Sequence, residues 1–242
     1  MATRLVSVVI DTPDPAGLAA WWGAALGWPV SHEDGESEAT PPAGEPGIDL
    51  VFVKVDDPRV ERNRVHLDLR TSSPEEQPAL VARLLDAGAK RADIGQGDVP
   101  WEVLEDPEGN VFCVLEPRAA SESTGAVAGI VVEASDPASL GRFWVSASGW
   151  KVGHQSDRTT ALIRPDGLGP WLAFVASDRP RLAKNRLHLD VAPGPDDDQG
   201  VEVARLHALG ARAVDVGQAV EDITWVVLAD PEDNEFCVLS PR

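Results

Sequence analysis

The sequence predicts an α+β protein that arose by tandem duplication, with two strand–helix–strand modules in each copy. Two observations support this prediction. A long stretch of the chain recurs about 122 residues later, and within each copy a strand-like segment followed by a helical one occurs twice. The length of 242 residues accommodates two domains of ordinary size.

The duplication is visible in motifs that keep a constant spacing. Residues 63–68 read NRVHLD and recur as NRLHLD at 185–190, an offset of 122. Residues 101–118 recur at 225–242 with an offset of 124, because two residues are inserted in the second copy. The segment between the copies is small and polar, which is typical of a linker. We therefore expect one domain at 1–118, a linker at 119–126 and a second domain at 127–242.

Each module begins with a strand and continues into a helix. Residues 7–12 and 66–71 are strand-like, and each leads into a turn that contains proline. Apolar residues at helical spacing then predict helices that end at Gly27 and Gly88, where a left-handed terminal residue costs least. Further strands are expected at 28–32, 48–55, 90–94, 101–105 and 111–116. The strands at 28–32 and 48–55 should form a hairpin through a loop at 33–47, of which 33–38 is expected to be solvated.

The charge balance limits the partners that the chain can have. It contains 21 Lys and Arg against 40 Asp and Glu, a net charge of -19. Such a surface repels phosphate backbones and anionic lipids, so we expect neither nucleic acid nor membrane as a partner. We find no apolar run of transmembrane length and no signal peptide in the first 14 residues, which favours a cytoplasmic location. Two cysteines do not form a disulfide scaffold.

With these features the chain resembles the vicinal-oxygen-chelate superfamily, which includes glyoxalase I, extradiol dioxygenases and bleomycin-resistance proteins. The resemblance rests on the paired modules, a helix that ends in Leu-Gly-Trp at 26–28, and the turn DPEGN at 106–110. The NRVHLD strand and the FCVL ending are similar to the glyoxalase-like branch. The resemblance implies domains of two βαβββ modules around a curved mixed sheet that lines a concave cleft. It also implies a small-molecule ligand, bound by a monomer of two packed domains or by a homodimer.

Strand alternation selects the residues that face this cleft. His66, Asp68 and Arg70 share one face of their strand, and His188 and Asp190 share the corresponding face in the second copy. A histidine and an aspartate on one face can hold a metal ion, transfer a proton or bond to each other, so these four are the candidate catalytic residues. The opposite face should be buried, and it consists of Val65, Leu67, Leu69, Leu187 and Leu189.

The resemblance also implies four metal-ligand positions in each copy. In the first copy they fall on Ser7, on Asp49 or Leu50, on His66 and on Cys113. In the second copy they fall on Gly129, on Trp171 or Leu172, on His188 and on Cys237. Few of these are metal donors, so no cofactor is predicted. If a divalent metal is bound, its candidate ligands are His66, Cys113, His188 and Cys237, assisted by a carboxylate such as Asp49 or Glu116.

The cysteines and three of the tryptophans complete the candidate ligand-binding site. Apolar neighbours favour buried thiols at Cys113 and Cys237, and an activated nucleophile is the alternative. Trp101 and Trp225 begin corresponding strands. The pattern is equally consistent with a cleft position and with a core position for these two residues and for Trp171. The other five tryptophans are expected in the core: Trp21, Trp22, Trp28, Trp144 and Trp150.

These observations lead to three hypotheses of function. The first is metal-independent binding of a drug or metabolite in two clefts, each with a His–Asp floor, a tryptophan wall and a cysteine at its base. The alternative is a metal-dependent lyase, isomerase or dioxygenase, and the third is a pure interaction module. Arg70 has no counterpart because Ala192 occupies its position, so an anionic ligand should prefer the first domain.

Overall fold

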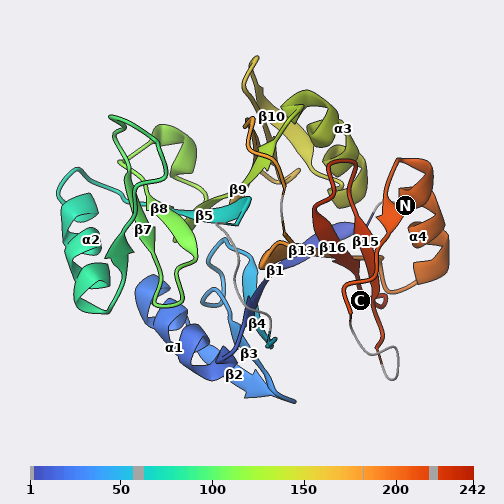
Figure 1. Cartoon of the computed structure of the whole chain (residues 1–242), viewed down its shortest axis with the longest axis horizontal. Coiled ribbons are helices and arrows are strands. Elements are labelled where there is room, and N and C mark those ends of the chain that lie inside the picture. Colours follow the sequence, from blue (N-terminus) through green and yellow to red (C-terminus); the bar gives the residue numbers. More distant parts are fainter. Residues whose placement is uncertain (1–2, 57–62, 182, 218–222) are drawn as a thin grey trace.

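The computed structural model describes residues 3–56, 63–181, 183–217 and 223–242, and shows an α+β fold. In these residues the strands form two eight-stranded mixed sheets, accompanied by four α-helices (Figure 1). The predicted fold class is confirmed, because four βαβββ modules follow one another along the chain.

The elements of the first repeat lie close to the predicted ranges. Its first module consists of β1 (Arg4–Thr12), α1 (Pro15–Leu26), β2 (Val30–Glu33), β3 (Glu36–Ala39) and β4 (Asp49–Lys54). Its second module consists of β5 (Val65–Leu69), α2 (Glu76–Asp86), β6 (Lys90–Arg91), β7 (Glu102–Glu105) and β8 (Val111–Val114). The short 3-10 helix η1 (Ala119–Ser121) follows.

The second repeat has the same order of elements. Its first module consists of β9 (Val127–Ala134), α3 (Pro137–Ser148), β10 (Lys151–Gln155), β11 (Thr159–Ile163) and β12 (Trp171–Ala176). Its second module consists of β13 (Leu187–Ala192), α4 (Gln199–Ala208), β14 (Arg212–Ala213), β15 (Val226–Ala229) and β16 (Glu235–Val238).

Local sequence signals explain where α1 begins and ends. The Asp14 side chain accepts a hydrogen bond from the Gly17 backbone N–H, and Pro15 occupies the first turn, where its missing N–H costs nothing. Gly27 ends the helix with a φ of 73°, in the left-handed region that glycine tolerates best.

One predicted loop contains a strand. We expected 33–47 to be the loop of a hairpin, but β3 lies within this range and pairs with β2 in an antiparallel hairpin. Asp34 and Gly35 connect the two strands with φ angles of 48° and 85°, as a tight two-residue hairpin turn requires. The correction matters for the site because it places Glu36 and Glu38 on a strand.

We expected each repeat to form a sheet of its own, but the structure combines the strands differently. Sheet A has the strand order β14-β15-β16-β13-β1-β4-β3-β2, and sheet B has the order β10-β11-β12-β9-β5-β8-β7-β6. Each sheet therefore joins one module of the first repeat to one module of the second. The junctions are the antiparallel pairs β1–β13 and β5–β9. The strands β5 and β13 carry almost the same motif, so the sequence does not distinguish one partner for β1 from the other.

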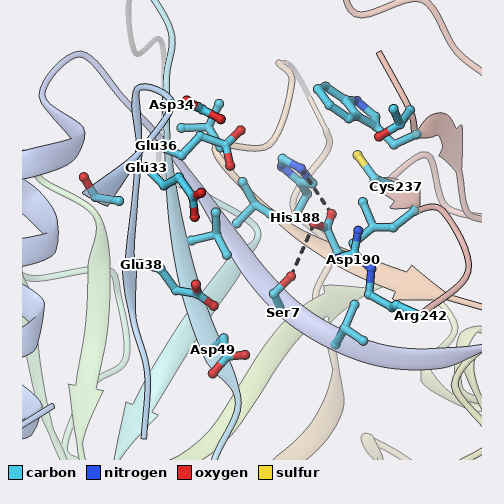
Figure 2. Close-up of a pocket in the computed structure, with 18 of the residues that line it drawn as sticks. Ser7, Glu33, Asp34, Glu36, Glu38, Asp49, His188, Asp190, Cys237 and Arg242 are labelled. Carbon is cyan, nitrogen blue, oxygen red and sulfur yellow. Dashed lines mark hydrogen bonds and ion pairs between the residues drawn. The ribbon is translucent and has the colours of Figure 1, made fainter. Parts of the chain in front are cut away.

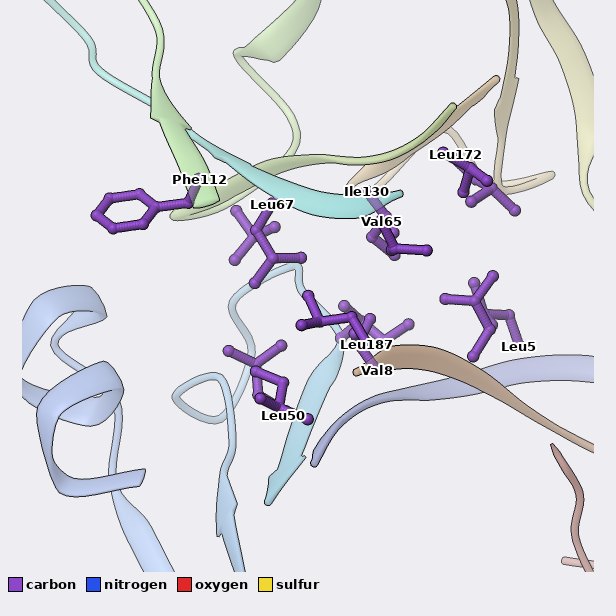
Figure 3. Close-up of a cluster of buried hydrophobic side chains, with 14 of the residues drawn as sticks. Leu5, Val8, Leu50, Val65, Leu67, Phe112, Ile130, Leu172 and Leu187 are labelled. Atoms are coloured by element: carbon purple, nitrogen blue, oxygen red, sulfur yellow. The ribbon is translucent and has the colours of Figure 1, made fainter. Parts of the chain in front are cut away.

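The apolar faces of the two sheets pack against each other in the centre of the molecule (Figure 3). Leu67 of sheet B and Leu187 of sheet A are 1% and 2% exposed, and the other members of the predicted buried face are equally inaccessible. Helix α1 packs on β3 and β4 of sheet A, while its Trp22 ring lies 5.2 Å from the Phe112 ring of sheet B. Trp144 of α3 contacts Phe236 in the same way from the other side, at 5.3 Å. The concave face of each sheet is consequently turned away from the common core.

Four of the five tryptophans predicted in the core are buried, and Trp21 is partly buried against it. Within the described residues, no helix combines the length and the apolar character needed to cross a bilayer.

Candidate functional site

The concave face of sheet A holds a hollow of about 640 Å³ (Figure 2). Its floor is formed by β1, β4 and β13, and the β2–β3 hairpin rises on one side. Trp225, next to the start of β15, lines it from the other direction. We call this hollow the sheet-A cleft. Its volume is within the range of small-molecule sites.

Four side chains form a row across the floor of this cleft. Asp49 of β4 pairs with Ser7 of β1, Ser7 pairs with Asp190 of β13, and Asp190 pairs with Cys237 of β16. The Ser7 hydroxyl donates a hydrogen bond to Oδ2 of Asp190 at 3.3 Å. Two members of the row come from the first repeat and two from the second, so the cleft exists only where the repeats meet.

His188 lies beside this row, with its Nε2 atom 3.7 Å from Oδ1 of Asp190. Among the described residues, neither His188 Nδ1 nor Asp190 Oδ1 has a hydrogen-bond partner, although both atoms are buried. Burial lowers the pKa of His188 to about 4 and raises the pKa of Asp190 to about 7. The imidazole is therefore neutral near pH 7, and the carboxyl exchanges its proton in that range.

Cys237 is the third member of this group. The residue is 6% exposed, and its thiol shares a hydrogen bond with Asp190. Burial raises the pKa of the Cys237 thiol, and the nearby Asp190 carboxylate raises it further. A thiol held protonated in this way is a poor nucleophile, which agrees with the prediction of a buried, inert cysteine.

Acidic residues dominate the hairpin side of the sheet-A cleft. Glu38 hydrogen-bonds to Asp49, and burial raises the pKa of both carboxyl groups. The proximity of Asp49 raises the pKa of Glu38 further, so this pair favours a shared proton. Glu33, Asp34 and Glu36 are exposed at the tip of the hairpin and also line the hollow.

The concave face of sheet B carries the equivalent histidine, aspartate and cysteine in a different setting. His66 Nε2 lies 3.5 Å from Asp68 Oδ1, and the cysteine is Cys113. Gly129 pairs with Asp68 where sheet A has Ser7, and Trp171 stands at the position of Asp49. We call this face the sheet-B cleft, because its strand pairings correspond to those of the sheet-A cleft.

Trp171 and Trp101 contribute indole surface to the sheet-B cleft. The Trp171 Nε1–H donates to the Ala120 carbonyl at 3.0 Å, which ties the ring to helix η1. Trp101 packs with Val103 and Cys113, and the Arg118 guanidinium lies 5.4 Å from the centre of its ring. Both rings are only partly buried, and the same holds for Trp225 where it lines the sheet-A cleft.

The strand pairing corrects the carboxylate ligands suggested for a metal at His66 and Cys113. Asp49 lies in sheet A, with His188, because β4 pairs with β1 and not with any strand of sheet B. Glu116 forms an ion pair with Arg118 at 2.7 Å. In both clefts the nearby carboxylate is the aspartate two residues after the histidine, and in each group of three the potential ligand atoms lie within 4.8 Å of one another.

Arg70 follows β5, and its backbone N–H bonds to Ala126 at 2.9 Å. The sequence did not identify Ser7 as a neighbour of Asp190, or Glu38 as a residue of the same cleft. The Asp-Gly pair at 34–35 is a hairpin signal that would have placed Glu38 on a strand. No comparable signal shows which repeat contributes the partner of Asp190.

Four βαβββ modules in two mixed sheets, with a His–Asp–Cys group on each concave face, define a glyoxalase-like protein of the vicinal-oxygen-chelate class. The sequence pattern of the Glyoxalase-like domain matches residues 7–115 and 129–239, so the chain belongs to this family.

Solved structures share the complete two-sheet fold. Glyoxalase I from Zea mays aligns with a TM-score of 0.62 over 99% of this chain and 92% of that chain, at 12% identity. A putative dioxygenase from Bacillus subtilis subsp. subtilis str. 168 aligns with a TM-score of 0.66 over 99% and 86%, at 11% identity. Identities this low establish a common fold and nothing about activity. No curated protein matches the sequence.

Proposed function

We propose that this protein binds a small organic molecule in the sheet-A cleft. The observation that carries the proposal is the pair of buried polar atoms, His188 Nδ1 and Asp190 Oδ1, that lack a hydrogen-bond partner among the described residues. An unpaired buried polar atom costs about 1–3 kcal/mol, and a ligand that bonded to both atoms would recover part of that cost. The adjoining hollow of about 640 Å³ has room for such a ligand.

The chemistry of the floor supports binding without a metal ion. Near pH 7 a neutral imidazole can both donate and accept a hydrogen bond, while the Asp190 carboxyl can do either according to its protonation. The protonated Cys237 thiol adds a weak donor. A polar floor beside the flat surface of Trp225 is suited to a molecule with both polar and planar parts.

A thermal-shift screen of neutral fragments against the full chain, pretreated with a chelator, tests this proposal. Fragments that raise the Tm should quench tryptophan fluorescence, and Trp225→Phe should remove that response, whereas the matched variant Trp101→Phe in sheet B should retain it. A screen without any stabilising fragment would refute small-molecule binding. A response that depends on Trp101 would place the binding site in sheet B.

A second candidate is metal-dependent chemistry, favoured by the donor set of His188, Asp190 and Cys237. Imidazole, carboxylate and thiolate are all zinc ligands, and catalytic zinc sites use three protein ligands with one open position. The donor atoms are close enough to bind one ion. A bound divalent cation would favour the thiolate despite its raised pKa, and when bound it would supply Lewis-acid chemistry.

Metal analysis separates the two candidates. Near-stoichiometric metal in protein purified without chelator, lost in Cys237→Ala and retained in Cys113→Ala, would support the metal-dependent candidate. Fragment binding that is equal before and after chelation would support metal-independent binding.

A further inference from the structure

We propose that the ligand of the sheet-A cleft is an organic cation, a small molecule that carries a protonated amino group. This inference rests on the proposed function, because it names the chemical class of the ligand for the same cleft.

The first argument is the charge of the lining residues. Among the described residues that line the cleft, only Arg4 and Arg242 are basic. Seven are acidic: Asp11, Glu33, Asp34, Glu36, Glu38, Asp49 and Asp190. Lys184 compensates Asp11 through an ion pair at 2.7 Å. Even when Glu38 and Asp49 share a proton, negative charge remains in excess, and a concave site lined by one sign of charge attracts the opposite sign.

The second argument is the state of Asp190, which distinguishes this cleft from an ordinary acidic surface. Its side chain is only 10% exposed, and its Oδ1 atom has no hydrogen-bond partner within the described part of the chain. Figure 2 shows Asp190 beside His188 and Ser7 on the floor of the cleft. A carboxylate oxygen left unsatisfied in this position is an acceptor for a hydrogen-bond donor at the end of the ligand that lies on the floor.

The third argument concerns the size of the cation. Asp190 on β13 and Glu38 on β3 are separated by three interstrand steps, which is about 14 Å at the usual spacing. A single metal ion contacts ligand atoms within about 2–2.6 Å, so it would leave the negative charge at one end of the cleft uncompensated. An extended organic cation fills the hollow, with its ammonium group against the acidic hairpin and its other end toward the Asp190 floor.

Sheet B provides an internal comparison. The positions of Glu38 in β3 and Asp49 in β4 correspond to Ala161 and Trp171 in sheet B. The acidic lining is therefore specific to the sheet-A cleft and is not a property of the fold.

Three probes with one carbon skeleton test the inference: 4-phenylbutylamine, 4-phenylbutan-1-ol and 4-phenylbutyrate. Binding is measured calorimetrically on the chelator-treated full chain at about 150 mM salt, where charges on the distant surface are screened. We expect the amine to bind at least about ten-fold more tightly than the alcohol, which corresponds to about 1.4 kcal/mol, and the carboxylate to bind more weakly still.

Matched charge variants locate the effect. Glu33→Gln/Glu36→Gln changes two exposed residues on the rim, so the fold should be retained, and the variant should bind the amine about ten-fold more weakly. Asp157→Asn/Asp196→Asn removes the same charge at exposed positions outside the cleft and should bind the amine like the wild type.

Several results would overturn the inference. An alcohol that binds as tightly as the amine would exclude a cationic ligand and leave the proposed function standing. Equal losses in the two double variants would show that the amine responds only to the overall charge. Displacement of the amine by an equimolar divalent metal would show that the cleft selects a metal ion. If no probe binds and the neutral fragment screen is also empty, the proposed function itself fails.

Discussion

Ser7 and Asp190 lie 183 positions apart in the sequence and are joined by a hydrogen bond of 3.3 Å on the floor of one cleft. The bond links the first strand of the first repeat to the strand with the NRLHLD motif in the second. A ligand on this floor therefore contacts both halves of the duplication. Mutations in either repeat are expected to affect its binding.

The back-to-back packing of the sheets predicts a large cost for Leu67→Ala. Leu67 is 1% exposed among apolar side chains of both sheets, so its truncation leaves a cavity. We expect the free energy of unfolding to fall by about 2–5 kcal/mol in chemical denaturation. Leu168→Ala, at a residue that is 49% exposed, is the control and should change stability by less than about 0.5 kcal/mol.

Asp190 predicts a specific dependence of stability on pH. Burial raises its pKa from 3.8 to about 7, so between these values the folded protein retains a proton that the unfolded chain has released. Its contribution to stability is complete below pH 3.8 and is lost as the pH rises through 7. His188 opposes this trend between 4 and 6.5, because its folded-state pKa is lowered.

The variant Asp190→Asn separates the contribution of Asp190 to the pH dependence of stability from that of His188. Relative to the wild type, its free energy of unfolding should increase by about 2–3 kcal/mol between about pH 5 and about pH 8. Urea denaturation of both proteins at the two pH values, in the presence of a chelator, provides the measurement. A stability difference that does not change with pH would contradict the raised pKa of Asp190.

Much of the fold follows from the sequence because its signals are local. The caps at Asp14 and Gly27, the alternation in the NRVHLD strand and the repeat offset each depend on neighbouring residues or on simple periodicity. The pairing of β1 with β13 instead of β5 is not local. Both candidate strands place a histidine and an aspartate on one face and leucine on the other, so the choice depends on three-dimensional packing.

The candidate site likewise divides into residues that local sequence signals can group and residues that they cannot. His188, Asp190, Trp225 and Cys237 could be grouped from alternation and repeat position alone. The acidic side of the cleft could not, because Glu38 and Asp49 belong to the other repeat. The family resemblance assigned four metal-ligand positions to each repeat. When these positions are grouped by sheet, those in sheet A are Ser7, Asp49, His188 and Cys237. In sheet B only His66 and Cys113 are metal donors.

Because Arg70 has no counterpart in sheet A, we predict that anions prefer the sheet-B cleft. Its counterpart in sheet A is Ala192, and the sheet-A cleft is lined by carboxylates that repel an anion. A carboxylate probe such as 4-phenylbutyrate should bind more weakly to Arg70→Ala than to the wild type, while Arg4→Ala should leave its binding unchanged. Calorimetric titration distinguishes the two variants, and an anion that responds to Arg4 alone would contradict the assignment.

Truncation of His66 should leave the fold intact. The side chain is 17% exposed at the surface of the sheet-B cleft, so His66→Ala opens no internal cavity. We expect a change of less than about 1 kcal/mol in the free energy of unfolding. A loss comparable to that of Leu67→Ala would show that the His66–Asp68 pair is a structural element of the sheet.

The central claim is that the ligand binds to the sheet-A cleft at His188 and Asp190. The most direct test is the dissociation constant of the tightest neutral fragment for the wild type, His188→Ala and His66→Ala, which change corresponding residues in the two clefts. We predict at least about ten-fold weaker binding to His188→Ala, and binding to His66→Ala within about two-fold of the wild type. Weaker binding to His66→Ala with unchanged binding to His188→Ala would contradict the claim.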